Sequence, residues 1–107
     1  MKYPTLIVAA CVLAACGGSS STGITAVACG SDSTLTYANF GSAFMANNCL
    51  SCHAARANPR LSTQTEVQSQ TARILQAAVY TEAMPQGTAI SLDERNLLGE
   101  WLACGAP

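Results

Sequence analysis

Two cysteines and a histidine lie together near the middle of the chain, in the stretch Cys49-Leu50-Ser51-Cys52-His53. Two thiols three positions apart can bind a structural zinc ion, take part in disulfide exchange, or form thioether bonds to the vinyl groups of a haem. In the haem case the adjacent imidazole is a ligand of the iron. The choice among these three chemistries depends on which other ligands the chain supplies.

Zinc binding and disulfide exchange each lack part of what they need. A structural zinc site takes four nitrogen or sulfur ligands, but His53 is the only histidine, and Cys29 and Cys104 stand far from the motif. A disulfide-exchange site expects a preceding strand, whereas the apolar residues before the motif repeat at helical spacing. The motif therefore favours covalent attachment of one haem to Cys49 and Cys52, with His53 as an iron ligand. Zinc and disulfide exchange remain the alternatives.

A haem iron has a second axial position, and a methionine is the candidate for it because the chain has no second histidine. Met45 stands four residues before Cys49 on the same expected helix, so it does not easily reach the other face of the haem. Met84 precedes Pro85, which ends a helix, and Gly87 permits a turn. We predict that Met84 is the second axial ligand, on an ordered loop. A methionine that only fills the core is the alternative.

The first 15 residues have the layout of a secretory signal peptide. Lys2 is followed by an unbroken apolar run over residues 6–15, which is too short to span a bilayer. Residues 13–16 (L-A-A-C) resemble a bacterial lipobox, in which the chain is cut before the cysteine and the cysteine is acylated. We predict a signal peptide at 1–15, a lipid on Cys16 and a location on the periplasmic side of the envelope, with the outer membrane favoured over the inner. An ordinary signal peptide with an unmodified Cys16 is the alternative.

Composition divides the remaining chain into a tether and one domain. Residues 16–34 are rich in glycine, serine and threonine and show no apolar periodicity, which predicts a flexible tether. Residues 35–107 are expected to form a single small domain. Because Lys2 is the only lysine, four arginines and six carboxylates give the mature chain a charge of 4 − 6 = −2. This balance excludes a basic nucleic-acid surface and a polybasic membrane site.

Cys29 and Cys104 are the two cysteines that belong neither to the signal peptide, nor to the lipidation site, nor to the haem motif. Cys11 leaves with the signal peptide, and Cys16 is expected to carry the lipid. Cys29 and Cys104 then form an even pair in an oxidising compartment, which predicts a disulfide. Such a bond closes a loop of about 75 residues and stabilises the fold by roughly 4 to 5 kcal/mol in the chain-entropy model. Two unrelated thiols are the alternative.

Apolar residues recur at helical spacing in three segments of the domain. The first segment carries Tyr37, Phe40, Gly41, Phe44, Met45 and Asn48, the second Val67, Thr71, Ile74, Leu75, Ala78 and Val79, and the third Leu97, Leu98, Trp101 and Leu102. Residues 91–94 (S-L-D-E) have the sequence of a capping box and predict the start of the third helix. No stretch alternates at period two for long enough to be a strand. We predict an all-α fold of three or more short helices around one haem.

Several further segments, together with the haem motif, carry a resemblance to a known family. They are Asn58-Pro59-Arg60-Leu61, Met84-Pro85, Leu98-Gly99-Glu100-Trp101-Leu102 and Gly41. With these, residues 35–106 resemble a small class I c-type cytochrome domain. In that family a Gly-Pro-x-Leu segment carries the proline whose carbonyl orients the histidine, and a Met-Pro pair supplies the distal ligand. Two departures are visible: Asn58 replaces the glycine, and Met45 stands where an aromatic residue often precedes the first haem cysteine.

The resemblance implies a cytochrome c fold with one covalently bound haem c, whose iron is ligated by His53 and Met84. The haem environment is expected to include Pro59, Leu61, Ile74 and Trp101. The resemblance also implies one-electron transfer rather than enzymatic catalysis, with redox proteins of the envelope or of a respiratory chain as partners and the membrane reached through the lipid on Cys16. A haem-based sensor with a labile distal ligand is one alternative. An electron-transfer subunit of a larger envelope oxidoreductase is the other.

Overall fold

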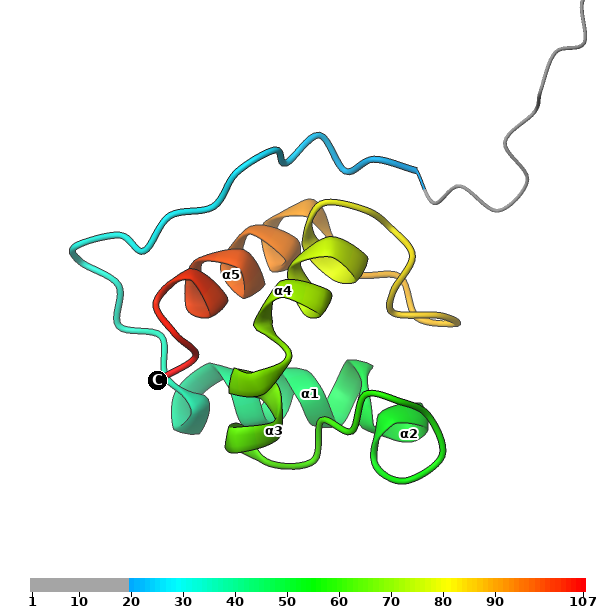
Figure 1. The fold of residues 1–107 in the computed structure, drawn as a ribbon. Helices are drawn as coiled ribbons and strands as arrows, with labels where there is room; N and C mark the ends of the chain where they lie inside the picture. The colour runs from blue at the N-terminus through cyan, green and yellow to red at the C-terminus, as the bar shows by residue number, and fades with distance from the viewer. Residues whose placement is uncertain (1–19) are drawn as a thin grey trace, which may run out of the picture.

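The computed structural model describes residues 20–107, so the predicted signal peptide at 1–15 and the lipidation site Cys16 lie outside the described residues. Within this described part every regular element is a helix, which confirms the all-α class, and the one strand-like pairing is a single bridge between Ser21 and Thr81. The elements are η1 (Tyr37–Gly41), α1 (Ser42–Asn48), α2 (Leu50–His53), α3 (Gln64–Ser69), α4 (Thr71–Ile74), η2 (Leu75–Val79) and α5 (Leu92–Ala103) (Figure 1). None of these helices in residues 20–107 has the length and apolar character needed to cross a bilayer.

The first helix runs without a break from η1 into α1, as the spacing of its apolar residues predicts. Thr36 precedes it in an extended conformation, and its hydroxyl accepts a hydrogen bond from the main-chain N–H of Asn39 at 3.1 Å. The Asn39 side chain in turn accepts from the Thr36 N–H at 2.7 Å. This reciprocal pair satisfies donors that a helix start leaves free. Phe44 and Met45 lie buried on the inward face of α1.

Gly41 marks the point where this first helix meets α5. A Cβ built on Gly41 would overlap with the indole ring of Trp101, which is fully buried. The indole packs against Tyr37 and Phe40, with ring centroids 6.4 and 5.8 Å apart. Its Nε1 donates to the carbonyl of Pro107 at 3.3 Å, so the end of the chain also closes on this ring. Only a residue without a side chain lets the two helices approach this closely.

The second helical segment is broken in two, although its apolar spacing predicts one helix. Gln70 leaves the helical conformation, with φ −115° and ψ 15°, between α3 and α4. Beside it the hydroxyl of Ser69 donates to the carbonyl of Glu66 at 2.7 Å, and that of Thr71 donates to the carbonyl of Gln68 at 3.0 Å. Short hydroxyl side chains that bond the main chain in this way compete with helical hydrogen bonds. The second piece, α4, then continues into η2.

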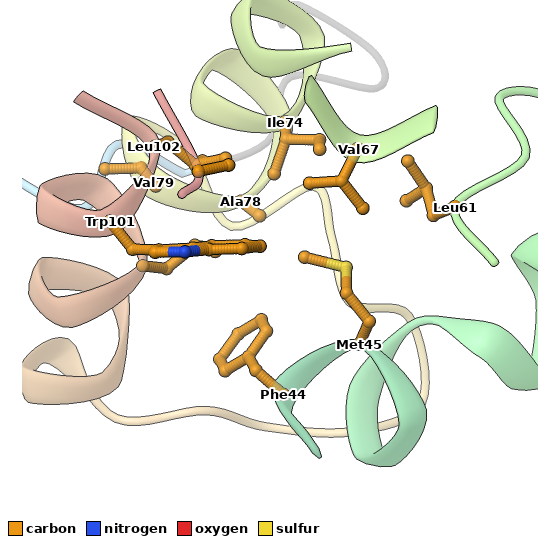
Figure 2. Packing of buried hydrophobic residues seen from close by; sticks show 11 residues of the cluster. Phe44, Met45, Leu61, Val67, Ile74, Ala78, Val79, Trp101 and Leu102 are labelled. Carbon is orange, nitrogen blue, oxygen red and sulfur yellow. The ribbon is translucent and has the colours of Figure 1, made fainter. Parts of the chain in front are cut away.

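The third helix, α5, begins at the predicted capping box. The Ser91 hydroxyl accepts from the Glu94 N–H at 3.1 Å, and the Glu94 carboxylate accepts from the Ser91 N–H at 3.0 Å. Trp101 lies within a cluster of buried side chains drawn from α1, α3, α4, η2, α5 and two loop positions, and Figure 2 shows the Met45 thioether directed into it. The cluster consists of Phe44, Met45, Leu61, Val67, Ile74, Ala78, Val79, Leu98, Trp101, Leu102 and Ala106.

Residues 20–34 lie along the helices, where the sequence predicts part of a flexible tether. The main-chain N–H of Thr22 donates to the carbonyl of Tyr80 at 3.1 Å, and the carbonyl of Ser20 accepts from the N–H of Glu82 at 2.9 Å. The described chain therefore starts beside the loop that follows η2 (Figure 1). Composition does not reveal this docking, because the hydrogen bonds are made by main-chain groups that every one of these residue types carries.

A disulfide fixes the other end of this docked segment. It joins Cys29 to Cys104, at the end of α5, across 75 positions of the sequence. Val27 packs on the same helix, where a Cβ at Gly99 would meet its Cγ1. The segment before η1 is thus fastened to α5 by a covalent bond and by side-chain packing.

Candidate functional site

An apolar cavity of about 360 Å³ brings together four residues that the sequence singles out, Cys49, Cys52, His53 and Met84. Its volume falls in the range of small-molecule and cofactor sites. Much of its wall is made of apolar side chains, among them Pro59, Leu61, Ile74, Ala77 and Ala78. α2 and the loop after η2 lie on the same side of the fold in Figure 1, which is how residues so far apart in sequence share one cavity.

The two thiols are positioned by the break between α1 and α2. Cys49 sits at the break with φ −125°, and a single helical turn then carries Cys52 and His53. The carbonyl of Cys49 accepts from the N–H of Cys52 at 3.3 Å and from that of His53 at 2.9 Å. Burial raises the pKa of the Cys49 thiol from 9.0 to about 11, while Cys52 is exposed. The raised pKa disfavours the thiolate form of Cys49, the form in which a thiol takes part in disulfide exchange.

The imidazole of His53 is held by a main-chain carbonyl. Its Nδ1 lies 2.7 Å from the oxygen of Pro59. Because a carbonyl only accepts hydrogen bonds, Nδ1 carries a proton, and in the neutral imidazole Nε2 then keeps its lone pair. The segment is closed a second time by the N–H of Leu61, which donates to the His53 carbonyl at 2.9 Å. His53 is therefore a half-buried side chain in one orientation, with one ring nitrogen free to bind a metal.

Met84 lies on the loop between η2 and α5, and both of its main-chain polar groups are bonded. Its N–H donates to the carbonyl of Ala77 at 2.8 Å, and its carbonyl accepts from the guanidinium of Arg95 at 2.9 Å. Pro85 follows, and Gly87 turns the chain with φ 75°, a conformation that favours glycine. Met84 is half-buried and lines the cavity. It therefore stands on an ordered loop.

Arg95 is the residue of this site that sequence reasoning missed. It is the buried charged residue of the described part of the chain, with 6% of its surface exposed. Its acceptors are main-chain carbonyls, so no opposite charge at helical spacing reveals it. A single cation that directly follows the two acidic residues of the first turn, Asp93 and Glu94, is the one signal that the sequence offers.

Trp101 and Met45 lie outside the cavity lining. Pro59, Leu61 and Ile74 border the cavity, but Trp101, which the sequence also predicts near the haem, does not. Because Gly41 has no side chain, the indole instead packs between η1 and Pro107. Met45 is likewise fully buried in the core cluster, which is consistent with the argument that excluded it as a ligand.

The donor groups of the described chain do not assemble a closed metal site. Among residues 20–107 no group of three or more His, Cys, Asp or Glu side chains is arranged to hold a metal ion. Cys29 and Cys104 are bonded to each other and so cannot complete a four-ligand zinc set with the motif. What the cavity offers is two thiols, one imidazole nitrogen and one thioether around an apolar volume.

Comparison with known proteins adds no family to this description. No protein-family model matches the chain, and no match is found among the curated proteins or the solved structures. Function must therefore be inferred from the residues and geometry of the cavity.

Proposed function

We propose that the chain is a monohaem c-type cytochrome that transfers single electrons at the bacterial cell envelope. The observation that carries the proposal is the grouping of Cys49, Cys52, His53 and Met84 around one apolar cavity. A bound haem would supply a one-electron iron couple. The chain's own part would be to attach the ring, fix the two axial ligands and keep water away.

The residues of the cavity fit a covalently attached haem. Cys49 directly precedes the single helical turn that contains Cys52, and the two thiols would carry the two thioether bonds. In the neutral imidazole of His53, Nε2 is the nitrogen available to iron because Nδ1 donates to the Pro59 carbonyl, and Met84 provides a soft sulfur ligand. The apolar wall suits the face of a porphyrin, and the crossing of the first and last helices at Gly41 supports a cytochrome c fold.

A carrier is favoured over an enzyme by the ligand set. If His53 and Met84 occupy both axial positions, no coordination position remains for a substrate. Methionine ligation favours the reduced iron and therefore a relatively high reduction potential. We further propose that the donor and acceptor are redox proteins of the envelope or of a respiratory chain, reached from a lipid anchor at Cys16 that keeps the domain near the membrane.

Optical spectroscopy on a matched pair of variants tests this function. The mature protein is produced in a host with haem-attachment machinery, and its oxidised and reduced spectra are compared with those of Met84→Leu and Met45→Leu. We expect a low-spin spectrum with the weak far-red sulfur-to-iron band, lost in Met84→Leu and kept in Met45→Leu. A high-spin spectrum that is the same in Met84→Leu and that shifts when CO is added would favour a haem-based sensor over an electron carrier. Absence of haem would contradict the proposal and favour a function in which Cys49 and Cys52 act as free thiols.

The proposed anchor and partners have their own tests. In cells labelled with a fatty-acid analogue, the wild-type chain should carry the label and sediment with membranes, whereas Cys16→Ser should do neither. Label retained by the variant would contradict lipidation at this site. A partner that co-purifies in fixed stoichiometry would identify the chain as a subunit of a larger oxidoreductase rather than a free carrier.

A further inference from the structure

Arg95 connects α5 to the chain segment that ends at Met84. Its Nη1 donates to three main-chain carbonyls, those of Ala78 at 2.7 Å, Thr81 at 3.2 Å and Met84 at 2.9 Å. Ala78 belongs to η2, whereas Thr81 and Met84 belong to the following loop. One cation thus holds both the beginning and the end of the turn that leads to Met84.

The burial of Arg95 makes this connection energetically significant. A guanidinium taken out of water loses hydration and has to be compensated by hydrogen bonds. Here the compensation comes from carbonyls. Arg95 also makes the one side-chain hydrogen bond to the main chain of Met84 in the described residues. The position of the Met84 loop therefore depends on Arg95, and the buried guanidinium depends on the carbonyls of that loop for its hydrogen bonds.

The geometry points to Arg95 as the positioning residue of the Met84 ligand, an inference that rests on the proposed function. By fixing the Met84 carbonyl, Arg95 confines the thioether to the cavity wall. When this bond is weakened, the loop leaves the wall more often and the sulfur leaves with it. No lysine and no second histidine follows residue 16, so no side-chain imidazole or amine of the mature domain can take the place of Met84. The vacated position is then open to an added ligand.

Imidazole binding measures how often Met84 is displaced. The apparent dissociation constant for imidazole is inversely proportional to the fraction of molecules whose sixth position is open. The haem-loaded mature protein is titrated with imidazole as wild type and as Arg95→Gln, while the far-red sulfur-to-iron band is followed. Since a hydrogen bond to a charged group is worth roughly a factor of ten or more, we expect Arg95→Gln to bind imidazole about tenfold more tightly and to show a weaker band.

Two controls separate positioning from charge and from general destabilisation. Arg60→Gln removes the same charge from an exposed side chain, and Leu102→Ala damages the buried face of the helix that carries Arg95. Both should bind imidazole within about twofold of wild type, although Leu102→Ala should melt at a lower temperature. Arg95→Lys, which keeps the charge and donors, should lie between wild type and Arg95→Gln. If Arg95→Gln does not accumulate as a folded protein, Arg95→Lys takes its place in the comparison with wild type.

The outcomes distinguish this inference from the function on which it depends. If the wild type shows the far-red band and Arg95→Gln and Arg95→Lys bind imidazole as the wild type does, Arg95 does not position Met84, and the carrier function stands. Equal tightening in Leu102→Ala would likewise overturn the positioning role, because any loss of stability would then open the site. A wild type without the band would overturn both, since Met84 would not be a ligand.

Discussion

The molecule has two regions that are held together in different ways. Around Gly41 and Trp101, buried side chains fill the space between the first helix and α5, and the Cys29–Cys104 disulfide joins the segment before η1 to the end of α5. Around the cavity, His53 and Met84 are only half-buried, and hydrogen bonds between side chains and main-chain carbonyls hold them in place. The first region is complete by itself. The second encloses an apolar cavity, which the proposed haem would fill.

Removal of both motif thiols should have the largest effect, because it prevents attachment of the group proposed to fill the cavity. We expect Cys49→Ala with Cys52→Ala to carry no covalent haem by mass spectrometry and to lack a cooperative melting transition by circular dichroism. The matched control, Cys29→Ala with Cys104→Ala, loses as many sulfur atoms but should retain haem. A thiol-free variant that melts like the wild type would show that the cavity region does not depend on a ligand.

Removal of the disulfide should have the next largest effect. It closes a loop across 75 positions, and the chain-entropy model predicts a loss of about 4 kcal/mol in the free energy of unfolding when it is absent. Denaturant titration of the Cys29→Ser, Cys104→Ser protein measures this loss. The far-red band should persist in the folded variant, because the bond lies in the other region. Loss of the band without loss of stability would contradict the division into two regions.

Gly41→Ala should destabilise the helix crossing by roughly 1–3 kcal/mol, since its new methyl group overlaps the Trp101 indole. Alanine's better helix propensity offsets part of this cost. Gly30→Ala is the control, because its Cβ meets only the end of the flexible Glu100 side chain, at 3.3 Å. Thermal melts of the two variants check the difference. Equal stability would mean that the crossing is looser than the buried indole implies.

Ser91→Ala should have the smallest effect, a loss of about 1 kcal/mol, because it removes the cap at the start of α5. Ser33→Ala is the comparison: the Ser33 hydroxyl is buried without a hydrogen-bond partner, so its removal should be neutral or slightly stabilising. Denaturant midpoints of the two variants measure the difference. The opposite order would contradict a stabilising role for the Ser91 cap.

The features that the sequence predicted correctly are those encoded by neighbouring residues. The first helix and α5 follow from apolar spacing, and the cap at Ser91 follows from a serine and a glutamate three positions apart. The close approach at Gly41 agrees with the family resemblance, which implies that the first and last helices cross closely at this glycine. Cys49, Cys52 and His53 are adjacent in sequence, so their proximity required no tertiary information. The roles assigned to them and to Met84 stay predictions.

The features that the sequence did not reveal depend on main-chain groups or on long-range packing. Arg95 bonds carbonyls 11 to 17 positions away, and carbonyls carry no residue identity. The docking of Thr22 beside Tyr80 has the same character. The break at Gln70 comes from hydroxyl groups that can serve either a helix or a turn. The packing of Trp101 against Tyr37 and Phe40 was not foreseen either, because periodicity shows which face of α5 is buried but not what lies against it.

The disulfide also changes the covalent topology of the molecule. Residues 29–104 form a closed ring, because the bond between Cys29 and Cys104 joins the two ends of that stretch. Cys49, Cys52, His53 and Met84 all belong to the ring. A protease that cuts one peptide bond in the exposed loop around Gly87 therefore opens the ring without producing two separate fragments. Met84 and Arg95, which lie on opposite sides of such a cut, would remain in one molecule until a reductant breaks the disulfide.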